Sequence, residues 1–224
     1  MAYVFNPFTG NLDSYGPILT GTGTVSAAAD GTAALPGIAF ASDTNTGIYR
    51  PGADQLAIST NGAERVRTDS SGYLRLSATS PGIQFNGDTA AANALDDYEE
   101  GTFTPTIIGT TTAGTATYTG QAGKYTKVGN LVTCLIYLNY SGGTGAGNLR
   151  IAGLPFAAVS GGSGAISFGI FSNIALAANS VATGYANELT SEITLTQYAS
   201  GGGGYAFIAY DAAGEILVSF TYFS

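Results

Sequence analysis

The sequence contains no histidine and no tryptophan, and its 224 residues include a single cysteine, Cys134. Without histidine, Ser-His and Cys-His catalysis is excluded, as are metal sites built on imidazole. Cys134 lies within an apolar run and has no histidine to activate it, so we interpret it as a small buried side chain. One cysteine also forms no disulfide framework. This is typical of a protein made in a reducing cytoplasm.

Charged residues are also scarce, at 10% of the chain against roughly 25% in typical globular proteins. The formal net charge is −8. Residues 1–100 include eleven acidic and four basic residues, whereas residues 101–224 include four acidic and three basic residues. An acidic chain with seven Lys and Arg is a poor match for phosphate, so we expect no nucleic-acid partner. No apolar run approaches the ~20 residues that span a bilayer. The N-terminal residues also lack the basic region of a secretory signal, and we expect no membrane insertion.

The motifs of common enzyme classes are missing as well. There is no Walker loop, and the glycine runs do not have the spacing of a nucleotide-binding turn. Asp43, Asn45 and Asp54 resemble part of a calcium loop, but Ile48 stands where that loop requires glycine, and a polar turn explains them better. The carboxylates do not suggest a glycosidase acid pair. We therefore predict a protein that is not an enzyme and that has no cofactor and no metal.

Glycine is abundant, with 33 residues, and composition changes sharply at the acidic stretch Asp96–Gly101. The first 19 residues are too aromatic for an ordinary terminus and too few for a core, which favours docking into another protein over folding back onto the chain. The next segment reads as a flexible linker or as an extended thread of associated chains. We predict a docking peptide at 1–19, a Gly/Thr/Ala linker at 20–35, a β-hairpin shaft at 36–94, an acidic joint at 95–105 and a head at 106–224.

The predicted shaft consists of short alternating strands, with Asn61-Gly62 as a strong hairpin signal. Its few large apolar side chains yield ~1.5–3 kcal/mol each on burial. Ordering the backbone costs about 1–2 kcal/mol per residue. So thin a strip is not expected to fold alone, and we predict that copies of the chain associate to build a shared core.

The head is predicted to be all-β, an antiparallel sandwich or jelly roll, because many short strands alternate with glycine-rich loops. The run Leu131–Tyr140 is apolar on both faces, which indicates that its second face meets another layer or another subunit. The expected strands are Thr104–Ile108, Thr115–Thr119, Gly123–Val128, Leu131–Asn139, Leu149–Ala152, Ala165–Phe171, Val181–Tyr185, Glu188–Gln197, Tyr205–Tyr210 and Glu215–Phe223.

Two stretches, Gly37–Leu56 and Leu95–Pro105, resemble bacteriophage tail-fibre proteins, and Tyr3–Asp13 is similar to the segment by which such fibres attach to the virion. The resemblance continues at Gly123–Asn130 and Gly153–Phe156. It implies a short homotrimer with an extended N-terminal anchor, a slender β-rich shaft and a C-terminal host-binding head. It also implies a virion tail appendage that is assembled in the host cytoplasm and attached to a tail or baseplate protein. The attachment residues would be Tyr3, Phe5, Pro7, Phe8 and Leu12.

The expected function is a fibre that binds a host-surface glycan or protein, with a glycan preferred. The alternatives are a purely structural appendage, such as a head fibre or collar piece, and an enzyme that degrades capsule. Glycine-rich loops at the far end of the head are the natural contact sites. Tyr140, Tyr198 and Tyr205 border two of these loops and are the candidate receptor contacts. The competing reading is that these glycines make crowded turns.

Overall fold

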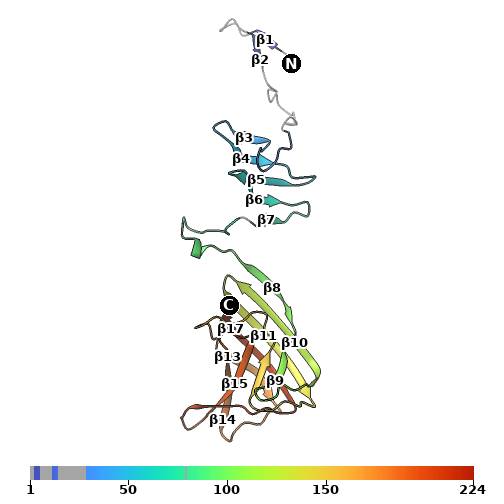
Figure 1. Cartoon of the computed structure of the whole chain (residues 1–224), viewed down its shortest axis with the longest axis vertical. Coiled ribbons are helices and arrows are strands. Elements are labelled where there is room, and N and C mark those ends of the chain that lie inside the picture. The colour runs from blue at the N-terminus through green and yellow to red at the C-terminus, as the bar shows by residue number, and fades with distance from the viewer. Residues whose placement is uncertain (1–2, 6–11, 15–28, 79) are drawn as a thin grey trace. The chain divides into compact units, whose positions relative to one another are not determined.

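A computed structural model describes residues 3–5, 12–14, 29–78 and 80–224. The chain divides into two compact units, Met1–Gly82 and Ile83–Ser224 (Figure 1). The predicted all-β class is confirmed, because β-strands account for nearly all the regular structure. In the described ranges the helical structure is limited to one 3₁₀ turn, Ala91–Asn93.

The first unit begins with β1 (Tyr3–Phe5), which pairs antiparallel with β2 (Leu12–Ser14). Three of the predicted attachment residues, Tyr3, Phe5 and Leu12, lie on these two strands. Pro7 and Phe8 lie outside the described residues, as does most of the predicted linker. The assignment of these residues to virion attachment remains a prediction.

The main sheet of the first unit is an antiparallel meander in which each strand pairs with the next (Figure 1). Its strands are β3 (Ile38–Phe40), β4 (Asp43–Tyr49), β5 (Leu56–Thr60), β6 (Ala63–Thr68) and β7 (Leu74–Leu76). The predicted Asn61-Gly62 hairpin is present, and both residues have positive φ, 53° and 71°. That backbone suits a two-residue turn whose twist matches the flanking strands.

One face of this sheet is closed by a small polar network. Tyr49 and Ala57 are buried there, and the Tyr49 hydroxyl donates to Glu64. The Arg67 guanidinium donates to both Glu64 carboxylate oxygens, at 2.6 and 2.8 Å, and to Gln55 Oε1 at 3.0 Å. These bonds from Arg67 lower the pKa of Glu64, while burial and the bond to Glu64 raise the pKa of Tyr49 to about 12. Most of the polar groups on this face therefore have partners within the chain, although the buried Ser59 hydroxyl has none among the described residues.

The second unit contains two antiparallel sheets whose inner faces share one core (Figure 1). The larger sheet has the order β13 (Ile166–Ser172), β17 (Gly214–Phe223), β11 (Leu131–Ser141), β10 (Thr117–Val128) and β8 (Tyr98–Phe103). The smaller has the order β14 (Ser180–Ala186), β15 (Glu192–Ala199), β12 (Leu149–Ala152) and β9 (Thr106–Gly109), and β16 (Tyr205–Phe207) also pairs with β15.

We call the second unit, Ile83–Ser224, the head. Its core lies between these two sheets and comprises twenty buried residues. The larger sheet contributes side chains such as Ile136 and Val218, and the smaller contributes Ile151 and Leu195, all fully buried. Alternation explains the selection, because every second side chain of a strand points to the same face. Burying each large apolar side chain contributes about 1.5–3 kcal/mol to stability. The head therefore has a core of its own.

The acidic stretch belongs to the head sheet. Residues 98–103 of the predicted joint form β8, the edge strand that pairs with β10 from Tyr98↔Val128 to Phe103↔Gly123. Lys127 forms an ion pair with Asp97, and the Tyr125 hydroxyl donates to Glu99. Pairing with β10 therefore gives these carboxylates partners that the sequence alone did not reveal.

The sequence predicts two strands here, Thr115–Thr119 and Gly123–Val128, but a single strand, β10, runs from Thr117 to Val128 and contains the second and most of the first. A β-bulge lies between Tyr118 and Gly120, where the register with β11 shifts. A Cβ on Gly120 would lie 2.4 Å from the Tyr137 ring, so glycine allows the strand to continue beneath that side chain.

Candidate functional site

The first unit carries a continuous row of apolar side chains across its five-stranded sheet, on the face opposite the polar network. The backbone register places each member directly beside the next on the neighbouring strand. We call this row the apolar ladder: Ile38, Ile48, Ile58, Val66 and Leu76. Phe40, Leu56 and Leu74 add further exposed apolar surface on the same strands.

The apolar ladder faces solvent in the single chain. Ile38 is 61% exposed and Ile58, on the central strand, is 45% exposed. Ile48 and Leu76 are 39% and 43% exposed, and Val66 is partly buried. Cross-strand apolar neighbours usually stabilise a sheet because they are buried together, and contiguous exposed apolar patches mark interaction surfaces. The ladder is therefore a candidate interaction surface.

A second exposed row crosses the outer face of the larger head sheet. Tyr98, Val128, Leu131 and Phe223 are successive neighbours on β8, β10, β11 and β17. All four are substantially exposed. The predicted two-faced burial of Leu131–Tyr140 is therefore not achieved within one chain, because β11 buries its even-numbered side chains and exposes Leu131 and Leu135.

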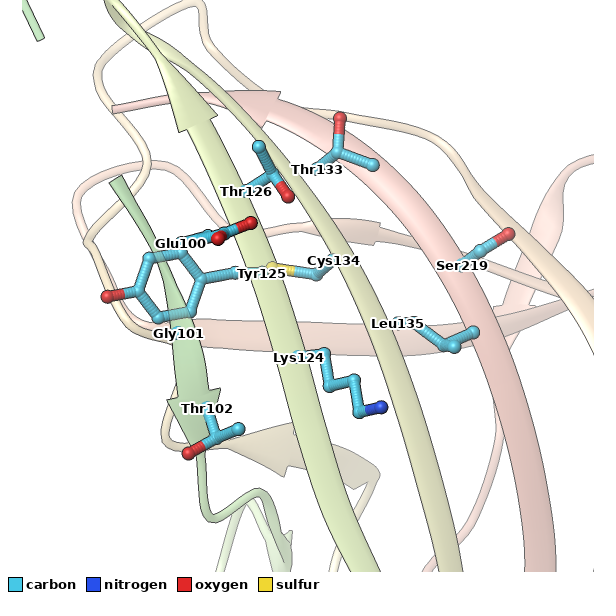
Figure 2. Close-up of a pocket in the computed structure, with 10 residues that line it drawn as sticks. All are labelled: Glu100, Gly101, Thr102, Lys124, Tyr125, Thr126, Thr133, Cys134, Leu135 and Ser219. Atoms are coloured by element: carbon cyan, nitrogen blue, oxygen red, sulfur yellow. The ribbon is translucent and has the colours of Figure 1, made fainter. Parts of the chain in front are cut away.

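A shallow depression of about 480 Å³ lies on this outer face. Figure 2 shows that its lining comes from four neighbouring strands, with Thr102, Lys124, Leu135 and Ser219 one from each. Beside them runs a row of Glu100, Thr126, Thr133 and Thr221, and the hydroxyls of Thr133 and Thr221 are 3.2 Å apart.

The depression does not bring together a catalytic set. Cys134 also lines it but is buried, and burial raises the pKa of its thiol to about 12. The thiol therefore stays protonated at neutral pH, whereas thiol nucleophiles react as thiolates. Lys124 and Glu100 are the only charged side chains in the lining, and both are exposed. This arrangement suits contact with another surface better than chemistry on a small molecule.

An aromatic cluster projects from the outer face of the smaller head sheet. Tyr198 on β15 and Tyr205 on β16 are directly opposed neighbours, and their rings are in edge contact at 6.1 Å between centroids. Phe207 continues the cluster at 5.7 Å from Tyr205. All three rings are close to half exposed. We call Tyr198, Tyr205 and Phe207 the aromatic cluster.

A hollow of about 240 Å³ adjoins the aromatic cluster. Thr196, buried on the same strand as Tyr198, lies in its lining with Thr183 and Tyr185 of β14. The rest of the lining includes Ser163, Gly164 and Ala165, and Ala165 forms an isolated antiparallel β-bridge with Tyr185. The hollow is thus rich in hydroxyl groups and contains no charged side chain.

Tyr140 lies elsewhere from the other two predicted contacts. It is 2% exposed and packs into the core beside Tyr118, with 6.4 Å between ring centroids. Burial, the largest cause, raises the pKa of its hydroxyl. Tyr140 has no exposed ring face to offer a ligand, so we remove it from the candidates and keep Tyr198 and Tyr205.

The glycine-rich loops also differ from one another. A Cβ on Gly145 would lie 2.3 Å from the Tyr210 ring, and one on Gly164 would lie 1.7 Å from the Thr221 carbonyl oxygen, so these glycines serve close packing. The run Gly201–Gly204, between Tyr198 and Tyr205, has open space around every residue. In this predicted loop the glycines are therefore not required by close packing.

The charged side chains of the head are mostly engaged in structural contacts. Arg150 pairs with Glu192 at 2.8 Å, the Tyr137 hydroxyl donates to Glu215 at 2.9 Å, and Asp211 accepts from the Ala175 backbone amide at 3.0 Å. Among the described residues, no three or more potential metal ligands gather. In the same ranges no helix has the length and apolarity to cross a membrane.

Comparison with known proteins yields little. No protein-family model matches the chain, and no curated protein matches it. Among solved structures, the crystal structure of the Dettilon tailspike protein is similar with a TM-score of 0.47 and 19% sequence identity. The match covers 56% of this chain and 23% of the tailspike chain, so most of the tailspike has no counterpart in it. At this TM-score the likeness carries no argument about function.

Proposed function

We propose that this chain is a non-enzymatic fibre component of a bacteriophage tail. It forms a homotrimer, attaches to a tail or baseplate protein through its N-terminal segment and binds a host-surface glycan through its head. The sequence motifs at Gly37–Leu56 and Leu95–Pro105 support the assignment to a phage fibre. The three-fold symmetry rests on that resemblance, whereas the need for association rests on the apolar surface that a single chain leaves exposed.

The observation that carries the proposal is the apolar ladder of the first unit. Five neighbouring apolar side chains line one face of a single sheet, and four of them are exposed while Val66 is partly buried. Covering them with the same surface of other copies would contribute about 25 cal/mol for every Å² of apolar area removed from water. A closed symmetric assembly satisfies all copies at once and leaves no apolar face open.

The outer face of the larger head sheet supports the same conclusion. Its exposed row, Tyr98 to Phe223, adds a second apolar surface. Glu100, two residues from Tyr98 on β8, and Lys124, four residues from Val128 on β10, lie on the same face of adjacent strands. Opposite charges on a self-associating face can pair between copies, and this favours one register of docking over others.

The aromatic cluster supports the glycan-binding part of the proposal. Exposed tyrosine rings supply rigid, flat contact area at low entropic cost, and their hydroxyls can donate and accept hydrogen bonds. The hollow beside them has the hydroxyl-rich lining that would match the hydroxyl groups of a sugar.

The proposal is tested first by light scattering on the purified chain over a range of concentrations. We expect a mass of three times the 22.6 kDa of the chain. A monomer at micromolar concentration would refute self-association, and a dimer would refute only the three-fold axis. Deleting residues 1–19 should leave the number of associated chains unchanged but abolish incorporation into phage particles. Loss of folding on deletion would assign the segment to the core of the first unit.

The second test is saturable binding to a panel of purified bacterial envelope polysaccharides. Binding that Tyr198→Ala abolishes supports the receptor function, and no binding to any member favours a purely structural appendage such as a head fibre or collar piece. The same incubations are assayed for reducing ends. Their release would show a capsule-degrading enzyme and refute the non-enzymatic assignment.

A further inference from the structure

We propose that the aromatic cluster and its hollow select uncharged sugar units and discriminate against anionic ones such as uronates, sialic acids and phosphorylated or sulfated sugars. The inference rests on the proposed glycan binding and adds the chemical class of the ligand. Three features of the hollow support it, namely its unpartnered hydroxyl groups, its lack of charge and its small size.

The hydroxyl groups around the hollow are available to a ligand. Thr183, Tyr185, Thr196, Tyr198 and Tyr205 all carry hydroxyls that have no hydrogen-bond partner in the described part of the chain. Each of these groups can donate one hydrogen bond and accept others. A neutral sugar presents hydroxyls with the same double capacity, so the two surfaces match without any formal charge.

The charges near the hollow have the wrong sign for an anion. None of the residues that line it is charged. The charged group that contacts the lining is the Glu188 carboxylate, which accepts a hydrogen bond of 3.5 Å from the Ser163 hydroxyl. An anionic sugar placed here would lose water and meet a carboxylate instead of a cation, which is unfavourable for a partly desolvated charge.

The head has three cations, Lys124, Lys127 and Arg150, and none of them lines the hollow. Lys127 pairs with Asp97, and Arg150 pairs with Glu192. Lys124 lies on the outer face of the larger sheet, in the depression of Figure 2, and does not line the hollow. The chain as a whole carries −8, so the long-range field also repels anionic glycans.

The shape of the site limits how much of a glycan it takes. A hollow of about 240 Å³ is below the roughly 300–1,000 Å³ of pockets for drug-sized ligands. It therefore suits a single sugar unit with one face against the rings of the aromatic cluster. Strong attachment of a longer glycan would come from several copies of the site acting together, as multivalent binding allows.

The test uses the full-length protein on two immobilised panels, one of neutral oligosaccharides and one of oligosaccharides that contain uronic acid, sialic acid or sulfate. We expect saturable binding to members of the neutral panel and at least ~10-fold weaker binding to every anionic member. Tyr205→Ala should reduce neutral binding at least ~10-fold, because it removes the central ring of the cluster. Thermal unfolding of each variant verifies that the head is folded.

Reversing the charge of Glu188 separates the effect of the carboxylate beside the hollow from the effect of the net charge of the chain. Glu188→Lys should raise binding to the anionic panel several-fold. Asp96→Lys makes the same change in net charge at an exposed position of the head outside the hollow and should have little effect. Stronger binding to anionic than to neutral sugars by the wild-type protein would overturn the selectivity but leave glycan binding intact. No binding to either panel would overturn both the selectivity and the receptor function.

Discussion

The two units of this chain alternate apolar and polar side chains in the same way, but they differ in what lies against the apolar face. In the head, two sheets face each other and enclose twenty buried residues. In the first unit, one sheet closes its polar face internally and leaves the apolar ladder exposed. Alternation therefore determines which side chains share a face, and a second layer determines whether that face is buried.

The difference has an energetic consequence. The head gains its apolar stabilisation within one chain, whereas the first unit buries few large side chains, of which Tyr49 is the largest. Burial free energy scales with apolar area removed from water, so the first unit must depend more strongly on contacts with other chains. Substitutions in each unit can therefore test this contrast.

Ile58→Asp should have the largest effect, because it should prevent the first unit from associating while leaving the head folded. Ile58 is the middle member of the apolar ladder, and a carboxylate there would be buried without a partner in the assembled protein, at a cost of several kcal/mol. We expect self-association to weaken at least ~1,000-fold, which corresponds to about 4 kcal/mol. The measurement is the mass from light scattering, which should fall to that of one chain while near-ultraviolet circular dichroism shows a folded head.

The matched control is Leu189→Asp. Leu189 is an exposed leucine of the head with a φ of 59°, a backbone that aspartate tolerates, and it lies outside both apolar rows. This variant should keep the wild-type mass. An unchanged mass for Ile58→Asp would show that the ladder is not an interface.

Two leucines of β11 test the same contrast within the head. Leu138 is fully buried, whereas Leu135 is 48% exposed on the outer face. Leu138→Ala should lower the free energy of unfolding by about 2–5 kcal/mol, because it leaves a cavity in the core. Leu135→Ala should change the unfolding of the isolated chain by less than about 0.5 kcal/mol but weaken self-association. Urea denaturation and light scattering measure the two effects, and equal destabilisation by both variants would contradict this account of the head.

The polar face of the first unit predicts a dependence on pH. Hydrogen bonds from Arg67 lower the pKa of Glu64 below its ordinary value of 4.5. A carboxyl with a lowered folded-state pKa contributes stability that is present above its unfolded pKa and is lost as pH falls through the folded one. The first unit should therefore lose stability in acid below about pH 4.5. The measurement is the loss of the folded-state NMR signals of the backbone amides of β5 and β6 as the pH is lowered. Glu64→Gln should flatten this acid dependence, and an unchanged slope would assign it to other groups.

Tyr49 predicts a loss of stability at alkaline pH. Its pKa is raised to about 12 from an ordinary 10.0, mainly by burial. The unfolded chain releases this proton first, so stability falls as pH rises from 10.0 toward about 12. Tyr49→Phe should reduce that alkaline loss in the first unit without altering it in the head. Equal changes in both units would contradict a local origin.

Much of the fold could be predicted from sequence because alternation and turn residues are local signals. The long strands β11 and β17 and the hairpin at Asn61-Gly62 follow from them directly. The edge strand β8 could not be recognised, because its composition is acidic and its assignment depends on pairing with β10, far from it in the sequence. The bulge at Gly120 likewise depends on the Tyr137 ring.

The candidate site was predictable in part. Tyr198 and Tyr205 border a glycine-rich loop, but Phe207 was missed, although its spacing of two from Tyr205 places it on the same face. Tyr140 shares its parity with the buried Ile136 and Leu138, so alternation alone could have assigned it to the core. The exposure of the apolar ladder could not be read from sequence, since it depends on the lack of a covering layer.

The smallest expected effect concerns the turn before β15. The sequence predicts a strand from Glu188, but the structure starts it at Glu192 because Leu189 has a φ of 59°. A left-handed conformation costs most residues about 1–2 kcal/mol, and asparagine less, because its side chain bonds locally to the backbone. Leu189 is 74% exposed, so its replacement sacrifices little burial. The first unit already uses this chemistry at Asn61, whose φ is 53°. We expect Leu189→Asn to stabilise the head by up to about 1 kcal/mol in urea denaturation, and Leu189→Val to destabilise it, because β-branched residues resist positive φ. If Leu189→Asn were destabilising, the leucine would have to make a contact outside the single chain, and this turn would join the candidate interfaces.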